Sequence, residues 1–229
     1  MKIIFPRSTD GFVKLLFITL AISSLKAQAV IDSRVDKWEF FLAPQFTNSK
    51  VLQFDGGAEA DINERSSLGF GFGYNVNANV ELDVQFSSST GNYTATAIPV
   101  IPVNPIEPLK SSTSLYTSNI NFGFTYNILS TPFTPYVSAS LGYTYIDSGI
   151  PTGDIGNYCY YYPYYGYVCT PIAKTYTSSE FNYGAGIGLR YDFNRKVYIK
   201  GDVNQNYLDI NSSNTADFTT YRFIFGFMF

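Results

Sequence analysis

The sequence contains no histidine among its 229 residues, and charged residues make up only 14% of it. The lack of histidine removes the commonest general base, the commonest metal ligand and every Ser-His or Cys-His nucleophilic pair. Disordered chains are rich in charge and poor in aromatic residues, whereas 18% of these residues are aromatic. Beyond the N-terminal segment no run of about 20 uncharged apolar residues occurs, which excludes a bundle of transmembrane helices. The composition therefore favours one folded domain whose apolar residues are spread thinly along the chain.

Residues 1–29 have the features of a secretory signal peptide. Basic residues lie in the first half, an apolar core of eleven residues, LLFITLAISSL, follows at 15–25, and the segment ends in Ala-Gln-Ala. That ending matches the small-x-small cleavage pattern, and the core is too short to span a bilayer as a helix. The alternative interpretation is a buried helix of the mature protein. We expect cleavage after the segment, which leaves 30–229 as the single mature domain.

The mature chain is acidic and exported. Without residues 1–29 it keeps 11 of the 15 basic and 17 of the 18 acidic residues, so its formal charge falls from −3 to −6. Nucleic-acid binding depends on clustered Lys and Arg, and we therefore expect no nucleic-acid partner. The two cysteines, Cys159 and Cys169, reach a compartment in which disulfides persist.

From Trp38 onward apolar and polar residues alternate with a period of two, which predicts β-strands. The connections after the second, fourth and sixth strands are a few residues long, whereas the others are longer. Short turns at one end and long loops at the other are typical of an outer-membrane barrel. The eight predicted strands are 37–47, 68–76, 80–87, 116–126, 137–145, 181–192, 197–204 and 220–229.

The two faces of these strands separate a transmembrane barrel from a soluble sandwich. One face is almost wholly aromatic or aliphatic, and the other carries Gly, Ser, Thr and Asn more than Lys and Glu. As a soluble core, the apolar face would have to hold most of 20 Phe and 20 Tyr residues in a small domain. Turned toward lipid it is favourable, and closing the sheet pairs every backbone N–H and C=O. Trp38, Tyr74, Tyr126 and Tyr191 at strand ends suit an interfacial aromatic girdle.

The C-terminal segment has apolar residues at every second position and ends in phenylalanine. With the eight-strand plan and the short turns, it resembles the OmpA transmembrane-domain and opacity-protein superfamily of small Gram-negative outer-membrane barrels, over about Lys37 to Phe229. In that superfamily such an end is the signal read by the barrel-assembly machinery. The residues that match it are Tyr221, Phe223, Phe225, Phe227 and Phe229.

The resemblance implies an all-β fold, an eight-stranded antiparallel transmembrane β-barrel with short periplasmic turns and long extracellular loops. It implies a monomer in the outer membrane that contacts lipid and lipopolysaccharide. The chain departs from OmpA in lacking a periplasmic peptidoglycan-binding domain, so the resemblance implies no anchor to the cell wall.

Several charged residues fall on the face that would line the barrel. They lie mostly near the turn ends of their strands, which places them in the periplasmic half. Glu81 and Asp83 are i, i+2 neighbours that suggest acid–base work, whereas the alternative is a set of mixed charges that neutralise one another. An eight-stranded barrel is just wide enough for side chains, which favours the structural role. The predicted interior charges are Glu39, Glu81, Asp83, Arg190, Asp192, Lys200, Asp202 and Arg222.

The connection after the fifth predicted strand is rich in tyrosine and contains both cysteines. If Cys159 and Cys169 are oxidised, they can only pair with each other. A metal site at the two cysteines would need further ligands, and the chain has no histidine to supply them. Tyrosine is enriched in binding loops because it offers amphipathic contact area with few rotors to freeze. Alternatively, these tyrosines pack among themselves or rest on lipopolysaccharide head groups. The predicted contact residues are Tyr158, Tyr160, Tyr161, Tyr162, Tyr164, Tyr165 and Tyr167.

These features predict a non-enzymatic surface protein with no cofactor and no metal. Its loops would serve adhesion or interaction with a host or matrix ligand, or the barrel would support the membrane mechanically. The alternative is a narrow, porin-like channel for small or hydrophobic solutes, as in the OmpW-like barrels, and the charged interior argues against it. A lipid-modifying barrel enzyme is disfavoured because those families use an active-site histidine.

Overall fold

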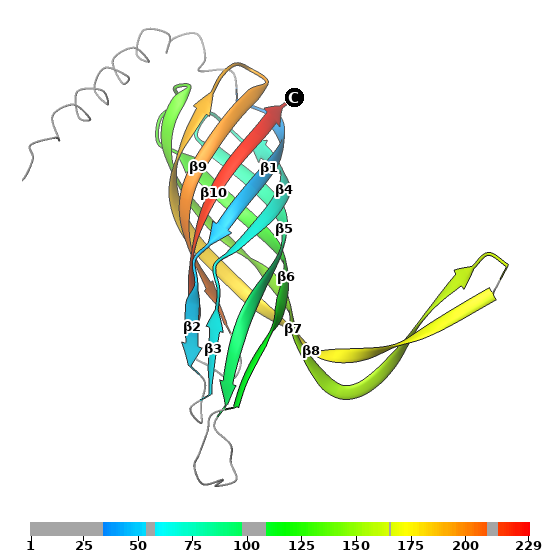
Figure 1. Cartoon of the computed structure of the whole chain (residues 1–229). Helices are drawn as coiled ribbons and strands as arrows, with labels where there is room; N and C mark the ends of the chain where they lie inside the picture. The colour runs from blue at the N-terminus through cyan, green and yellow to red at the C-terminus, as the bar shows by residue number, and fades with distance from the viewer. Residues whose placement is uncertain (1–33, 54–57, 98–108, 165, 210–214) are drawn as a thin grey trace, which may run out of the picture.

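The computed structural model describes residues 34–53, 58–97, 109–164, 166–209 and 215–229, and the predicted signal peptide lies outside them. One antiparallel sheet makes up nearly all of this part of the chain (Figure 1). Among the described residues we find no helix with the length and apolarity needed to cross a bilayer. The strands are β1 Lys37–Thr47, β2 Lys50–Gln53, β3 Glu59–Ile62, β4 Arg65–Asn75, β5 Val80–Ala97, β6 Leu109–Asn127, β7 Phe133–Tyr162, β8 Gly166–Asp192, β9 Val197–Leu208 and β10 Ala216–Met228.

Eight of the described strands close into a ring. β1 pairs with β4, the order continues through β5, β6, β7, β8 and β9, and β10 pairs back with β1. At the closing seam Leu42 lies opposite Phe225, and Trp38 and Phe229 exchange two backbone hydrogen bonds of 3.1 and 2.9 Å. Closure gives the backbone N–H and C=O groups at the two edges of the sheet hydrogen-bond partners, which lipid could not supply. The predicted all-β, antiparallel, self-closing fold is confirmed.

Side chains alternate between the two surfaces of the ring. In β1, Leu42 and Phe46 are exposed on the outside, whereas Glu39 and Ala43 are completely buried inside. Water would disfavour such an apolar exterior, whereas the hydrocarbon of a bilayer suits it. Large apolar side chains exposed on the outer face include Trp38, Phe70, Phe72, Leu82, Phe122, Phe124, Val137, Leu141, Ile187, Leu189, Val203 and Phe223.

The interior is narrow enough that small residues decide what fits. Tyr198 is fully buried, and its ring lies against Gly226 of the neighbouring β10. A Cβ at position 226 would come within 2.2 Å of Tyr198 Cζ. Glycine at 226 therefore leaves the space that the tyrosine ring occupies.

Two short strands that the sequence pattern does not predict extend the wall of the ring at the end opposite the short turns (Figure 1). β2 and β3 form a hairpin, and β3 pairs with the far part of β5. Lys50 Nζ of the hairpin donates to Asp217 Oδ1 of β10 at 2.5 Å, which ties the hairpin to the ring. Leu52 and Ile62 pack with Phe218 in an apolar cluster under the hairpin.

The connection after the fifth predicted strand is not a loop, and that prediction is wrong. β7 pairs with β6 only as far as Asp147, and beyond it β7 and β8 pair with each other as a two-stranded ribbon. Register shifts flank Pro151, and Gly149 and Gly153 have φ of 64° and 89°, so the ladder is interrupted where the ribbon begins. Figure 1 shows this ribbon, in yellow-green, leaving the ring and bending away from it. We call residues 151–175 the arm.

Candidate functional site

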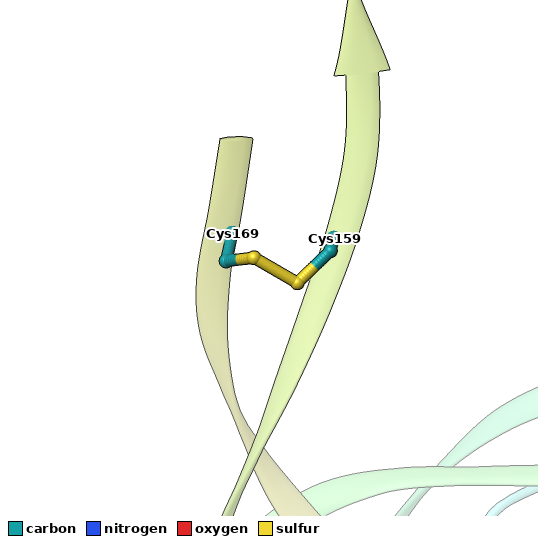
Figure 2. The surroundings of a disulfide bond; sticks show 2 residues. All are labelled: Cys159 and Cys169. Atoms are coloured by element: carbon teal, nitrogen blue, oxygen red, sulfur yellow. A yellow bond between two sulfur atoms is a disulfide. The ribbon is translucent and has the colours of Figure 1, made fainter. Parts of the chain in front are cut away.

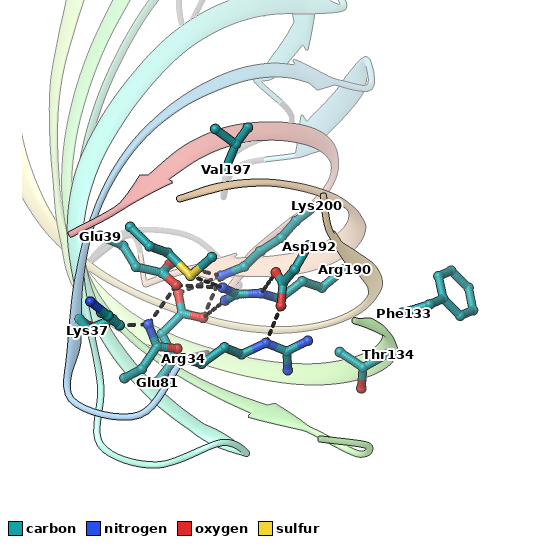
Figure 3. Close-up of polar contacts among 12 residues, drawn as sticks. Arg34, Lys37, Glu39, Glu81, Phe133, Thr134, Arg190, Asp192, Val197 and Lys200 are labelled. Carbon is teal, nitrogen blue, oxygen red and sulfur yellow. Dashed lines mark hydrogen bonds and ion pairs between the residues drawn. The ribbon is translucent and has the colours of Figure 1, made fainter. Parts of the chain in front are cut away.

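The interior near the short turns is filled by a network centred on Arg190. Its guanidinium donates from Nη2 to Glu39 Oε1 at 2.6 Å, from Nη1 to Glu81 Oε2 at 2.8 Å and from Nε to Asp192 Oδ1 at 2.8 Å (Figure 3). The four residues come from β1, β5 and β8. All four side chains are 0 to 1% exposed. One guanidinium therefore joins three strands from within the ring.

Two further cations complete what we call the ion-pair network. Lys200 Nζ donates to both oxygens of Glu81, at 2.5 and 2.6 Å, and Arg34 donates to Asp192 from Nε. The Tyr198 ring lies 4.2 Å from Arg190 Cζ and 5.1 Å from Lys200 Nζ, distances that suit cation–π attraction. Three cations and three carboxylates thus compensate one another. The network consists of Arg34, Glu39, Glu81, Arg190, Asp192 and Lys200.

A second cluster lies further along the ring. Arg222 donates to both oxygens of Asp202, at 2.9 and 3.0 Å, and to Gln85 Oε1 at 2.9 Å. The Tyr136 hydroxyl donates to Asp202 at 2.5 Å, and Asn204 also donates to that carboxylate. The cluster therefore ties β5, β7, β9 and β10 together.

The predicted acid–base pair is not assembled as a pair. Lys200 donates to both Glu81 oxygens and Arg190 donates to Oε2. Asp83 lies instead against Gly123, where a Cβ would come within 2.3 Å of the Asp83 Oδ1. The Glu81 carboxylate is held by two buried cations and its side chain is only 1% exposed. The arrangement therefore suits mutual neutralisation rather than proton transfer.

The arm carries the disulfide. Cys159 of β7 lies opposite Cys169 of β8 in the ladder, and the two sulfur atoms are bonded (Figure 2). The bond staples the ribbon near its tip. The turn beyond it contains Tyr164 at φ 76°, a left-handed conformation.

Three of the predicted contact tyrosines are strongly exposed on the arm. Tyr161 is 64% exposed, Tyr167 is 78% exposed and Tyr164 is fully exposed at the tip. The rings of Tyr161 and Tyr167 also contact each other across the ribbon, with centroids 5.6 Å apart. For Tyr158, Tyr160 and Tyr162 the structure describes the backbone, which lies in β7, and residue 165 lies outside the described residues.

The predicted assembly segment lies on the outward face of the closing strand. The five residues alternate with inward Ile224 and Met228, which are 5% and 3% exposed. This outward register places their rings where the bilayer would be. The outward residues are Tyr221, Phe223, Phe225, Phe227 and Phe229.

A closed antiparallel ring with an apolar exterior and a charge-compensated interior is the architecture of an integral outer-membrane β-barrel. The family model for the outer membrane protein beta-barrel domain matches residues 15–229, and the chain belongs to that family. The protein therefore belongs to the outer membrane.

Two solved structures are similar to the chain, and the likeness to the first of them supports the same fold. The outer membrane protein OprG from Pseudomonas aeruginosa matches with a TM-score of 0.52 and 11% identity, over 87% of this chain and 99% of that chain. Neisserial surface protein A matches with a TM-score of 0.48 and 13% identity, over 84% and 95% of the two chains. No curated protein matches the chain in sequence. At this identity the likeness to OprG concerns the fold alone.

Sequence reasoning missed several residues of the interior. Arg34 lies before the first strand, where the alternation of apolar and polar residues gives no signal. Its position just before a strand is the one feature of the sequence that could have indicated it. Tyr136 and Tyr198 point inward although most tyrosines on the strands face out. Both bind charged groups with a ring or a hydroxyl, which a pattern that sorts residues only as apolar or polar cannot show.

Proposed function

We propose that this chain is a non-enzymatic surface protein of the outer membrane that binds a partner outside the cell through the arm. The observation that carries the proposal is the disulfide-stapled ribbon that leaves the ring with Tyr161, Tyr164 and Tyr167 exposed. In this family's architecture the short turns are periplasmic and the longer connections extracellular. The arm then extends into the medium, and the barrel acts as a monomeric anchor.

The arm has physical properties that favour binding. The two bonded cysteines are ten residues apart in the sequence. In the chain-entropy description, closing a loop of that size raises the free energy of the unfolded ribbon by roughly 2–3 kcal/mol. A ribbon that is ordered before binding loses less conformational entropy when it meets a partner. Exposed tyrosines then supply contact area that is apolar on the ring face and polar at the hydroxyl.

The other surfaces of the barrel support accessory contacts. The apolar exterior suits outer-membrane lipid, and the part of the arm next to the ring suits lipopolysaccharide head groups. The outward C-terminal residues from Tyr221 to Phe229 suit recognition by the barrel-assembly machinery during biogenesis. The described interior carboxylates of the ion-pair network are all bound by cations, which is consistent with the absence of enzymatic chemistry.

The test is a binding experiment with cells that display the protein, added to host cells or immobilised matrix proteins. We expect the triple variant Y161S/Y164S/Y167S to lose binding by about tenfold or more, because central aromatic residues typically dominate an interface. The double variant C159S/C169S should bind more weakly than the native protein because its arm is less ordered. Tyr116, an exposed tyrosine on β6 outside the arm, provides the control, and Y116S should bind as the native protein does.

Unchanged binding by the triple variant would overturn the proposed contact surface. Native protein that binds lipopolysaccharide vesicles but neither cells nor matrix would assign the tyrosines to the membrane surface instead.

A second candidate, a narrow channel for solutes, is favoured by one observation, a cavity of about 470 Å³ in the ring. The ion-pair network fills the ring on the side of the short turns, and its side chains are at most 4% exposed. Passage through the ring would require several buried ion pairs to separate. Single-channel recording of the purified protein distinguishes this role from binding by the arm.

A further inference from the structure

The cavity occupies the part of the ring that lies away from the short turns. Its floor includes Arg222, Gln85 and Asn204 of the second cluster, and the β2–β3 hairpin contributes to its other end. At about 470 Å³ it is in the size range of small-molecule sites. It is therefore large enough for a ligand of modest size.

The wall of this cavity is divided by chemistry. Around the ring it carries hydroxyl and amide side chains such as Ser87, Thr117 and Asn182. Toward the hairpin it carries an apolar patch whose members pack against one another. The patch consists of Leu52, Ala60, Ile62, Tyr93, Leu115 and Phe218. A ligand with a polar group and an apolar body would satisfy both parts.

The charge of the wall is positive. Its described lining residues include Arg65 and Arg222 but no aspartate and no glutamate, although the whole chain is acidic. Arg222 is neutralised by Asp202. Arg65 has no ion pair or hydrogen bond to its side chain anywhere in the described part of the chain. Among its described lining residues the cavity therefore has one uncompensated cation, Arg65.

Arg65 also has an unused donor. Its Nη1 is buried and has no hydrogen-bond partner among the residues that the structure describes, and its Cζ lies 5.3 Å from the centre of the Phe218 ring. Gln45 Nε2, which belongs to another lining residue, is likewise buried and unpartnered. Thr47 lies opposite Arg65 between β1 and β4, so Gln45 is two register positions away on the same inward face. Two unpartnered donors thus lie on neighbouring strands, and a buried polar group without a partner is costly.

We propose that the cavity binds a monocarboxylate with a short apolar chain. The carboxylate accepts hydrogen bonds from Arg65 and Gln45, and the chain packs against Leu115, Phe218 and the rest of the apolar patch. Charge-assisted hydrogen bonds of this kind are stronger than neutral ones, so the anion is preferred to the corresponding alcohol. The proposal is independent of the partner of the arm.

The experiment measures binding of octanoate and of octanol by calorimetry to the refolded protein in zwitterionic nanodiscs, with empty nanodiscs subtracted. We expect saturable, one-to-one binding of octanoate and at least tenfold weaker binding of octanol. The variant R65Q should bind octanoate about tenfold or more weakly. R195Q, in the exposed turn between β8 and β9, should bind as the native protein does.

Three results would overturn the proposal: no saturable octanoate binding to the native protein, equal affinity for octanol and octanoate, or native affinity in R65Q. The comparison of the two ligands uses the native protein, so it decides the matter even if R65Q fails to refold. Q45A, which removes the second donor without removing a charge, should show an intermediate affinity.

Discussion

Replacing Arg190 with methionine should destabilise the barrel by about 3–5 kcal/mol, the range typical of removing one partner from a buried ion pair. The methionine fills much of the same volume, but Glu39, Glu81 and Asp192 would then share only two cations. The excess negative charge has no access to water, because these side chains are at most 1% exposed. The measurement is urea unfolding of the protein refolded into phospholipid vesicles.

Two further variants separate charge from packing. R190M/E39Q restores equal numbers of buried cations and carboxylates, and we expect it to recover part of the lost free energy of unfolding. R195M removes an arginine from the exposed turn and should lie within about 0.5 kcal/mol of the native protein, as surface substitutions usually do. If R190M unfolded at the native urea concentration, the ion-pair network would not contribute to stability.

Arginine at Phe223 should impair insertion into the bilayer. Phe223 is 52% exposed on the outer face of the closing strand β10. A lipid-facing arginine costs about 2–4 kcal/mol near the bilayer midplane. We therefore expect F223R to refold poorly into vesicles and to reach the outer membrane at a lower level than the native protein.

The matched variant F223L keeps an apolar side chain at the same position and should insert almost as well as the native protein. M228L replaces an inward side chain, 3% exposed, and should also be tolerated. Equal insertion of F223R and F223L would mean that this face does not meet lipid.

Alternation was enough to place the strands of the ring and to sort their faces. The prediction of 37–47 coincides with β1, and the inward residues Glu39, Glu81 and Arg190 were assigned from period two alone. This success has a physical reason. A strand between lipid and a narrow interior must alternate strictly, and a slip of one residue would turn its charged residues toward hydrocarbon.

The arm and the β2–β3 hairpin, which lie beyond the ring, do not follow from the alternation of apolar and polar residues. The two strands of the arm do not have one solvated and one buried face, so residues 151–175 show no period of two and their sequence predicts a loop. The β2–β3 hairpin has strands of four residues, too short for alternation to be recognised. The sequence does not distinguish Arg65, because an arginine at a strand start is ordinary and its missing partner is a property of the folded structure.

The central claim is that the ring is embedded in lipid with its alternate aromatic residues facing outward. The most direct measurement is the set of nuclear Overhauser effects between lipid acyl-chain protons and aromatic side chains of the protein in nanodiscs. Phe72 and Phe225 are exposed on the outer face, whereas Phe41 and Tyr198 are buried inside the ring at 3% and 0% exposure. We predict effects from acyl chains to Phe72 and Phe225 and none to Phe41 and Tyr198. Acyl-chain effects to Phe41 and Tyr198, or their absence at Phe72 and Phe225, would contradict the assignment of the two faces.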